Sequence, residues 1–463
     1  MSEEMKSTTD VAEGAATEKK KASLIIKMII GSVLGLLLFC VPLPWGGGSS
    51  TMLLSIMKTA IENQIAGILR PIALAIMVIS LVGTIYMFIT KDKEHGKFVK
   101  AAFAPTIVNL IVRACAVVIS AMVFFEAGPE WLLSPDTGGM MFTFLMPSLI
   151  LFFYLGTILL YFLTDYGLME LVGSLVERVF RPLFRLPARS AVLCISGFFG
   201  SGTVQILAAD AEHRKGYLTR RETSIISVGF CTITFGAMFA YSCGIGGLDD
   251  KYFAGLFGAS VLAAVVSVII MSRIPPLSKI PNTYYEGNRQ IYQEGKGGFK
   301  VGFNRAYSKV KEAPSFPKMV VMGSKLTTSI CFEVIPMIIV MGTIVTVLAT
   351  YTPVFDWVAT PFVPVLKLIG VPEAAKVAPS LFTGFADLLL PFIGAAGVES
   401  QLATFILCVV AISQVICMTE TGMIISKSSA PISVGKLFLC FLEKTVIALL
   451  IGLLVGRLMG IPV

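Results

Sequence analysis

Charged residues are scarce in this chain of 463 residues: Asp, Glu, Lys and Arg together make up 14%, against about 25% in an average soluble protein. Hydrophobic residues reach 55%. This composition excludes a large soluble catalytic domain, and it predicts an all-α polytopic protein embedded in a lipid bilayer. The net charge of +8 comes from particular loops. That pattern is typical of membrane topology and argues against nucleic acid as a partner.

Histidine is also scarce, and the cysteines are not paired in the sequence. The two histidines, His95 and His213, lie in basic loops, and none of the nine cysteines forms a C-x-x-C pair. We therefore expect no disulfide framework, no metal site and no cofactor. The G-x-S-x-G elbow and the Gly-Lys-Ser/Thr phosphate loop are missing too, and a serine nucleophile would find no histidine base inside the membrane. The sequence predicts no enzyme.

Long apolar runs make up most of the chain. Nine of them have the length of a membrane span, and two more, 193–205 and 374–397, are interrupted by glycine and polar residues. Three other stretches are amphipathic, namely 51–69, 170–187 and 354–369. The predicted spans are 24–41, 72–89, 101–125, 140–164, 223–244, 253–271, 327–351, 401–425 and 437–458.

Loop charge decides how the interrupted stretch 193–205 crosses the membrane. If the N-terminal lysines are cytoplasmic, the basic loop 91–100 falls inside and the acidic loop 126–139 falls outside, as the excess of Lys and Arg on cytoplasmic loops requires. The long basic segment 273–325 then lies inside only if 193–205 enters and leaves on one side. We therefore interpret 193–205 as a re-entrant helical hairpin. The alternative is an ordinary span whose small residues allow close helix packing.

An internal repeat relates the two halves of the chain. Each half has an amphipathic F-x-P segment, an interrupted apolar stretch and a span with identically spaced Ser, Cys and Gly. Because the loop charges give the two copies opposite orientations, we predict an inverted-topology repeat, which in transporters places the binding site near the midplane. The alternative is a duplicated bundle without a transport role. The matching residues are Phe180, Pro182, Ser227, Cys231 and Gly236 in the first copy and Phe362, Pro364, Ser413, Cys417 and Gly422 in the second.

The predicted organisation has five parts. They are a disordered cytoplasmic tail (1–22), N-terminal transmembrane helices (23–139), a first repeat (140–272), a cytoplasmic polar linker (273–325) and a second repeat (326–463). We expect the chain to cross the membrane several times and to have a cytoplasmic N-terminus.

Three motifs give the chain a family resemblance. Residues 180–187 (FRPLFRLP), 196–203 (SGFFGSGT) and 418–422 (MTETG) resemble the nucleoside-recognition, or Gate, domain family, and more closely the YjiH-like bacterial membrane proteins. The resemblance covers about residues 145–456. It implies Gate-like repeats that form a hairpin-based transport core, with a nucleoside as the first expected solute. It also implies a location in the bacterial inner membrane. The chain departs from the G-Q-T-E type tip of nucleoside transporters, because its first tip ends Thr203-Val204-Gln205.

Polar residues at membrane depth are the candidate binding groups. Hydroxyl and amide groups lie beside the helix ends of the hairpins, where partial charges suit a polar solute, and acids at this depth are costly and usually functional. The alternatives are close packing for the small residues, an interfacial position for Asp387, and a cap paired with Lys427 for Glu420. Glu443 and Lys444 are interpreted as a local pair. The predicted substrate-binding residues are Ser201, Thr203, Gln205, Thr234, Thr383, Asp387, Gln414, Thr419 and Glu420.

These features predict a secondary transporter of a small polar solute that works by alternating access. A nucleoside is the first expected solute and an amino acid or dipeptide the second, with coupling to H⁺ or Na⁺ left open. The rival class is a non-transporting membrane scaffold or subunit. Besides the solute and the bilayer, the expected partners are a second copy of the chain or another Gate-type membrane subunit.

Overall fold

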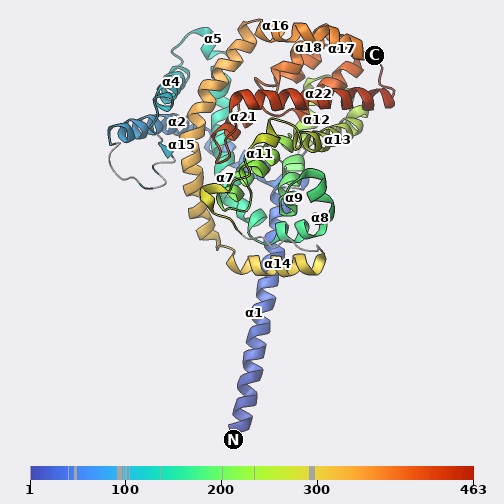
Figure 1. Ribbon diagram of the computed structural model, residues 1–463. Coiled ribbons are helices and arrows are strands. Elements are labelled where there is room, and N and C mark those ends of the chain that lie inside the picture. The colour runs from blue at the N-terminus through green and yellow to red at the C-terminus, as the bar shows by residue number, and fades with distance from the viewer. Residues whose placement is uncertain are drawn as a thin grey trace.

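The computed structural model describes residues 2–39, 41–45, 49–90, 96, 99, 102–103, 105–135, 137–200, 202–233, 235–290 and 298–462. The fold is helical apart from one antiparallel hairpin, in which β1 (Pro42–Trp45) pairs with β2 (Ser49–Met52). Within the described residues, seven helical segments are long and apolar enough to cross a membrane. The prediction of an all-α polytopic membrane protein is therefore confirmed (Figure 1).

The N-terminal part differs from the predicted boundaries in two places. Helix α1 (Ser2–Phe39) runs through the predicted disordered tail and projects from the body (Figure 1), because extending a helix costs less free energy than nucleating one. Helix α2 (Leu53–Ile89) continues through Pro71, so the separate amphipathic helix 51–69 is wrong. One proline removes a single backbone hydrogen bond, and a packed helix can tolerate that loss.

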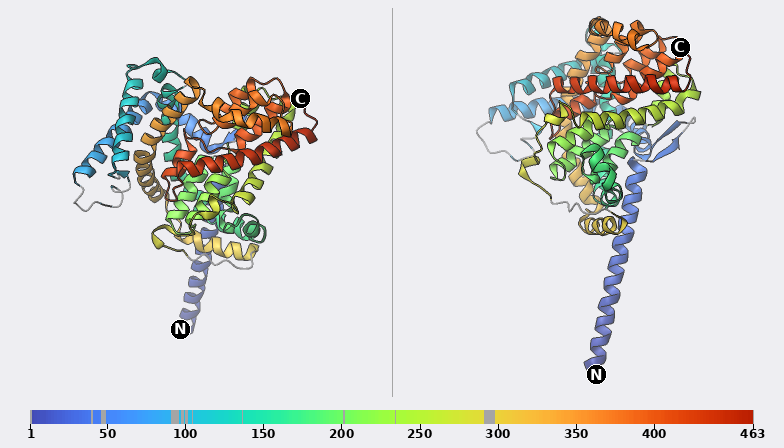
Figure 2. Two further views of the ribbon diagram at one scale, coloured as in Figure 1. Left: turned by 45° about the horizontal axis from the view of Figure 1, so that its top comes forward. Right: turned by 45° about the vertical axis from the view of Figure 1, so that its right-hand side comes forward.

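The remaining N-terminal elements form one edge of the molecule. Helix α2 packs against α4 (Ile107–Phe124), and both lie beside the central helices (Figure 2). The connection from α4 to the central body consists of α5 (Glu130–Leu133), α6 (Gly138–Met140) and the π-helical turn η1 (Met141–Leu145).

The first half of the central body begins with α7 and ends with α13. It alternates long helices with short ones that are interrupted by π-helical or 3₁₀ turns. The elements are α7 (Met146–Thr164), α8 (Leu168–Phe184), η2 (Ala188–Ser190), α9 (Ala191–Ile195), η3 (Ser196–Gly200), α10 (Gly202–Arg214), α11 (Arg220–Gly229), α12 (Phe235–Phe239), η4 (Ala240–Ile245), η5 (Asp250–Tyr252) and α13 (Phe253–Met271).

The second half follows a linker that contains η6 (Leu277–Lys279), η7 (Tyr285–Gly287) and α14 (Phe299–Glu312). Aligning the first residue of α8, Leu168, with the first residue of α16, Val354, brings the elements that follow into the same order, and we call this alignment the repeat register. The elements are α15 (Phe316–Tyr351), α16 (Val354–Ala359), η8 (Thr360–Phe362), α17 (Val363–Ile369), α18 (Ala374–Thr383), α19 (Leu390–Ala396), α20 (Gln401–Ser413), α21 (Thr421–Lys427) and α22 (Val434–Leu458).

Both interrupted stretches lie between residues that meet in space. The guanidinium of Arg189 is 2.7 Å from the carboxylate of Glu212, so the chain returns after α9 and α10 to the point it left. In the second half, Glu373 Oε1 accepts hydrogen bonds from the backbone N–H groups of Glu399 (2.9 Å) and Ser400 (2.8 Å). We call residues 189–212 the first hairpin and residues 373–400 the second hairpin.

The predicted continuous spans 223–244 and 401–425 are wrong. Helix α11 ends at Gly229 and α12 begins at Phe235, while α20 ends at Ser413 and α21 begins at Thr421. We call the two interruptions break 1 and break 2.

The tip of each hairpin supplies backbone partners to the break of its own half. The N–H of Gly202 donates to the carbonyl of Thr232 (3.2 Å), and the N–H of Met418 donates to the carbonyl of Phe385 (2.9 Å). Backbone groups that have left a helix must find such partners, because lipid offers none.

Candidate functional site

A polar cluster lies where the first hairpin meets break 2. The hydroxyl of Thr203, at the start of α10, donates a hydrogen bond to the carboxylate of Glu420, in break 2. The two residues are 217 positions apart in the sequence. Thr203 is 4% exposed, and Glu420 is partly buried. We call Thr203, Asp387, Thr419 and Glu420 the central polar cluster.

Asp387 brings the tip of the second hairpin into this cluster. Its carboxylate accepts a hydrogen bond from the backbone N–H of Leu389 (2.8 Å) and another from the hydroxyl of Thr419. Asp387 is 8% exposed and lies close enough to Glu420 for the two carboxylates to interact electrostatically. Two acids in one buried place suit a proton, a cation or the hydroxyl and amino groups of a solute.

Two glutamines in the same region carry polar atoms without a partner. Gln205 Nε2 donates to the carbonyl of Ile226 (3.3 Å), but Gln205 Oε1 has no hydrogen-bond partner among the described residues. Gln414 Oε1 accepts from the hydroxyl of Thr445 (2.8 Å), and Gln414 Nε2 is likewise unpaired within that part of the chain. Both side chains are at most 1% exposed. Buried orphan atoms are rare in proteins, so each of the two marks a place for a ligand group or a water molecule.

The nine predicted binding residues divide into three groups. The central polar cluster and the two glutamines account for Thr203, Gln205, Asp387, Gln414, Thr419 and Glu420. Thr383 meets the cluster through its backbone carbonyl, which accepts from the N–H of Asp387 (3.1 Å), while its hydroxyl donates to the carbonyl of Ser380 (3.1 Å) in its own helix. Ser201 and Thr234 lie outside the described residues.

Lys444 is the residue that the sequence prediction misassigned. Its ammonium is fully buried and donates to the carbonyls of Val228 (2.9 Å), Gly229 (3.3 Å) and Cys231 (3.4 Å), at break 1. Among the described residues no ion pair joins it to a carboxylate, so the local pair with Glu443 is wrong. Neighbours in a helix point in different directions. An ionisable residue within a predicted span was the signal that singled it out.

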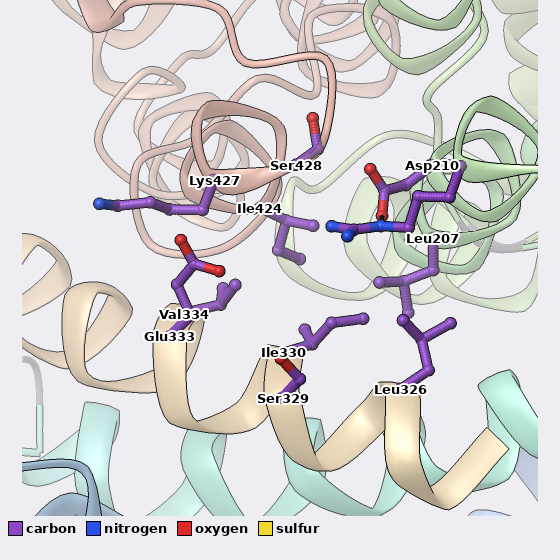
Figure 3. A pocket seen from close by; sticks show the side chains of 11 residues that line it. Leu207, Asp210, Leu326, Ser329, Ile330, Glu333, Val334, Ile424, Lys427 and Ser428 are labelled. Atoms are coloured by element: carbon purple, nitrogen blue, oxygen red, sulfur yellow. Dashed lines mark hydrogen bonds and ion pairs between the residues drawn. The ribbon is translucent and has the colours of Figure 1, made fainter. Parts of the chain in front are cut away.

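A charged pocket lies beside the cluster. Its volume is about 60 Å³, and α10, α15 and α21 line it. Asp210 accepts from Arg214 Nε (2.7 Å) and from the backbone N–H of Ser429 (2.5 Å). Glu333 and Lys427 face each other on the opposite side (Figure 3). Acids and bases are thus present together in a space that holds a few water molecules.

A thin apolar layer separates this pocket from the central polar cluster. Leu207 and Ile424 line the pocket. They lie one helical turn from Thr203 and Glu420, respectively, since each pair is four residues apart. Helices α10 and α21 are packed side by side over this length. The cluster therefore lies one turn of helix beyond the floor of the pocket.

A buried ionic network holds the base of the first hairpin. Arg189 contacts Glu212 (2.7 Å) and Glu170 (3.4 Å), and Lys215 contacts Asp165 (3.0 Å). Burial lowers the pKa of Lys215, but the carboxylates of Glu212 and Asp165 outweigh burial and hold that pKa above its ordinary value. Burial raises the pKa of Glu170 despite the nearby Arg189. This network links α7, α8, η2 and α10.

Comparison with known proteins places this architecture in a family. Residues 146–248 match the sequence profile of the Gate domain, described as nucleoside recognition. An uncharacterised protein of Alkalihalophilus pseudofirmus is 33% identical over 447 residues, which cover 95% of this chain and 96% of that relative. The YjiH-like resemblance fits the matched domain. The chain therefore belongs to one family with this relative, a family of polytopic membrane proteins that carry the nucleoside-recognition (Gate) domain.

Proposed function

We propose that this protein is a secondary transporter that carries a small polar solute across the bacterial inner membrane by alternating access. The observation that carries the proposal is the contact between Thr203 and Glu420, which joins the tip of the first hairpin to break 2 of the other half. Interrupted helices at membrane depth are tolerated where they line a cavity or a site, and paired interruptions mark transporter sites. A Gate-domain membrane protein of this kind fits a transporter better than an enzyme.

The relation between the halves supports an inverted repeat. The repeat register preserves the order of the amphipathic helix, the hairpin, the broken helix and the final span. Helix α8 lies toward one end of the molecule, and its counterparts α16 and α17 lie at the other end (Figure 1). Two halves of opposite orientation can exchange their conformations, and such an exchange would open the central polar cluster first to one side and then to the other.

The charged pocket supplies one route to the cluster. Its volume of about 60 Å³ admits water but not a nucleoside or an amino acid. The Leu207–Ile424 layer and the hydrogen bond from the N–H of Ser429 to Asp210 close the route between the pocket and the cluster. We therefore assign this conformation as closed on the side of the pocket.

The chemistry of the cluster favours a nucleoside first. The orphan Gln205 Oε1 is an acceptor and the orphan Gln414 Nε2 is a donor, and a nucleobase carries groups that can pair with either kind of atom. The carboxylates of Asp387 and Glu420 can accept hydrogen bonds from sugar hydroxyls. An amino acid or dipeptide is the second candidate, because the same acids can bind its amino group. Either acid can also carry a coupling proton or bind Na⁺.

Uptake into proteoliposomes tests this proposal. The purified chain should take up at least one labelled solute from a panel of nucleosides, amino acids and dipeptides, and uptake should saturate. Glu420→Gln and Asp387→Asn should each reduce it at least tenfold, because each change removes a buried charge that contacts the solute or ion. Glu399→Gln is the matched control, since Glu399 is an exposed acid at the end of the second hairpin.

Two outcomes would contradict the proposal. Folded protein that neither binds nor transports any solute, alone or with another Gate-type subunit, would favour the scaffold. Full activity in both acid variants would exclude the central polar cluster as the site.

A further inference from the structure

We infer that Lys444 is a tethered cation: its ammonium fills a site for a small monovalent cation at break 1, so that no free ion binds there in the native protein. Lys444 lies in the last span, α22, and is 0% exposed. Its three acceptors, the carbonyls of Val228, Gly229 and Cys231, lie at the C-terminal end of α11 and just beyond it. The inference depends on the proposed function only where transport is measured; the unfolding measurements test it independently.

The acceptors have the chemistry of a cation site. The C-terminal end of a helix carries partial negative charge. Unwound carbonyls at such an end are the groups that coordinate Na⁺ or H⁺ in transporters with broken helices. The three N···O distances of 2.9, 3.3 and 3.4 Å place one positive charge among these carbonyls. Because no carboxylate of the described residues is ion-paired with Lys444, the carbonyls alone stabilise its buried charge.

The second half shows that a charge is not required merely to cap a break. At break 2 the residue next to Lys444, Thr445, donates its hydroxyl to the side-chain Oε1 of Gln414 (2.8 Å), and no lysine of the described residues donates to the backbone carbonyls of that break. The repeat register aligns Gly258 with Lys444, so the matching position has no side chain. An ammonium at break 1, without a counterpart at the matching position, therefore calls for a reason other than capping, and occupation of a cation site supplies one.

The two breaks consequently differ in sign. Break 1 contains the ammonium of Lys444, while break 2 contains the carboxylate of Glu420 and faces that of Asp387. A mobile coupling ion is thereby excluded from break 1 and directed to the acids of the central polar cluster. Removal of the tethered charge should create a vacant cation site where the native protein has none.

Thermal unfolding of the purified full-length protein in different salts tests the inference. The salts are NaCl, KCl, NH₄Cl and choline chloride at equal ionic strength, because choline is too large to enter. The wild type and Lys444→Arg, which keeps the charge, should unfold at the same temperature in all four. In choline chloride, Lys444→Met should unfold at a lower temperature than the wild type. At least one of the small cations should raise that temperature, and the effect should saturate with cation concentration.

Lys444→Gln separates charge from hydrogen bonding, because its amide still donates to the carbonyls but carries no charge. It should respond to the same cation as Lys444→Met. Both uncharged variants unfolding at the same temperature in every salt would overturn the inference, whether they are as stable as the wild type or uniformly destabilised. A saturable response of equal size in the wild type would overturn it as well.

Transport separates this inference from the proposed function. In choline chloride, Lys444→Met should take up the solute at least tenfold more slowly than the wild type. The cation that stabilises the variant should restore its uptake. If the variant gains cation-dependent stability while the wild type transports nothing, the tethered cation stands and the transporter proposal fails. If transport is normal and no variant responds to cations, only the tethered cation fails.

Discussion

At the scale of single residues, two glycines make room for the glutamines of the candidate site. A Cβ atom added to Gly197 would lie 2.1 Å from the side chain of Gln205, and one added to Gly384 would lie 2.0 Å from Gln414 Nε2. Real Cβ atoms do not approach other atoms this closely. Each glutamine is fully buried, so it has little space into which to move. The orphan atoms thus owe their positions to glycine on the facing hairpin limb.

Gly197→Ala and Gly384→Ala should therefore impair binding. Each added methyl group must displace a buried glutamine, at a cost of about 1–3 kcal/mol for an overpacked core. We expect at least a tenfold loss of solute uptake and a lower unfolding temperature. Gly258→Ala is the matched control, because Gly258 is a helical glycine with open space around it; alanine should leave it as stable or slightly more stable. Equal behaviour of all three variants would contradict the role given to the glutamines.

Local patterns explain why some site residues were predictable and others were not. Asp387 and Glu420 are recognisable because acids are costly within apolar stretches. Their common location depends on contacts between distant parts of the chain, such as the bond from Thr203 to Glu420, and no local pattern records such contacts. Lys444 was visible as an ionisable residue in an apolar span, but its sequence neighbour Glu443 suggested the wrong partner. Its true partners are backbone carbonyls. Every residue type has such a carbonyl, so the sequence does not show which ones Lys444 contacts.

At the scale of elements, the two hairpins are closed by different chemistry. The first is closed by Arg189, which is 2% exposed and contacts Glu170 and Glu212. The second is closed by Glu373, which accepts backbone N–H groups and pairs with the exposed Lys376 (2.8 Å). Buried ion pairs are costly to break from one side, whereas exposed pairs contribute little.

Arg189→Met should therefore destabilise the protein strongly. It leaves Glu170 and Glu212 buried with less compensation, which costs about 3–5 kcal/mol when a buried pair loses one partner. Thermal unfolding should show a clear loss of stability. Lys376→Met is the matched control at the second hairpin and should unfold close to the wild-type temperature. A similar loss in both variants would mean that the buried network does not hold the first hairpin.

The helix breaks mark the limit of prediction at this scale. The glycine and polar residues of 193–205 and 374–397 distinguish these stretches from ordinary spans within the sequence itself. Residues 223–244 and 401–425 also contain glycine and polar residues, Glu420 among them, but each has the length of a full span and no local pattern fixes where its helix ends. Their helices break where a hairpin tip supplies backbone partners, as Gly202 does for Thr232. That partner comes from another element, so local periodicity does not contain it.

At the scale of the whole molecule, the proposed inverted repeat predicts which side of the membrane each surface faces. The polar linker 273–325 and the end of the second hairpin should lie on opposite sides of the membrane, because Lys and Arg are concentrated in the linker. Arg289→Cys and Glu399→Cys place single new thiols at these exposed positions. A membrane-impermeant maleimide added to intact cells should label Glu399→Cys, and Arg289→Cys should react only after the cells are opened.

The parent chain supplies the background for this labelling, because it already contains free cysteines. Labelling of both new thiols from the same side would contradict the opposite orientation of the two halves. The same result would remove the support that the repeat gives to alternating access.

Helix α15 is longer than the membrane is thick and contains an internal proline. Its 36 residues measure about 54 Å at 1.5 Å per residue, against a hydrocarbon core of about 30 Å. Its internal proline, Pro336, lies three residues beyond Glu333, which lines the charged pocket. A helix bends most easily at an internal proline, because one backbone hydrogen bond is missing there. Bending of α15 at Pro336 would therefore move two parts together, namely the pocket-lining residues before Pro336 and helix α16, which follows the C-terminal end of α15. Opening of one face of the molecule and closing of the opposite face would then be a single motion.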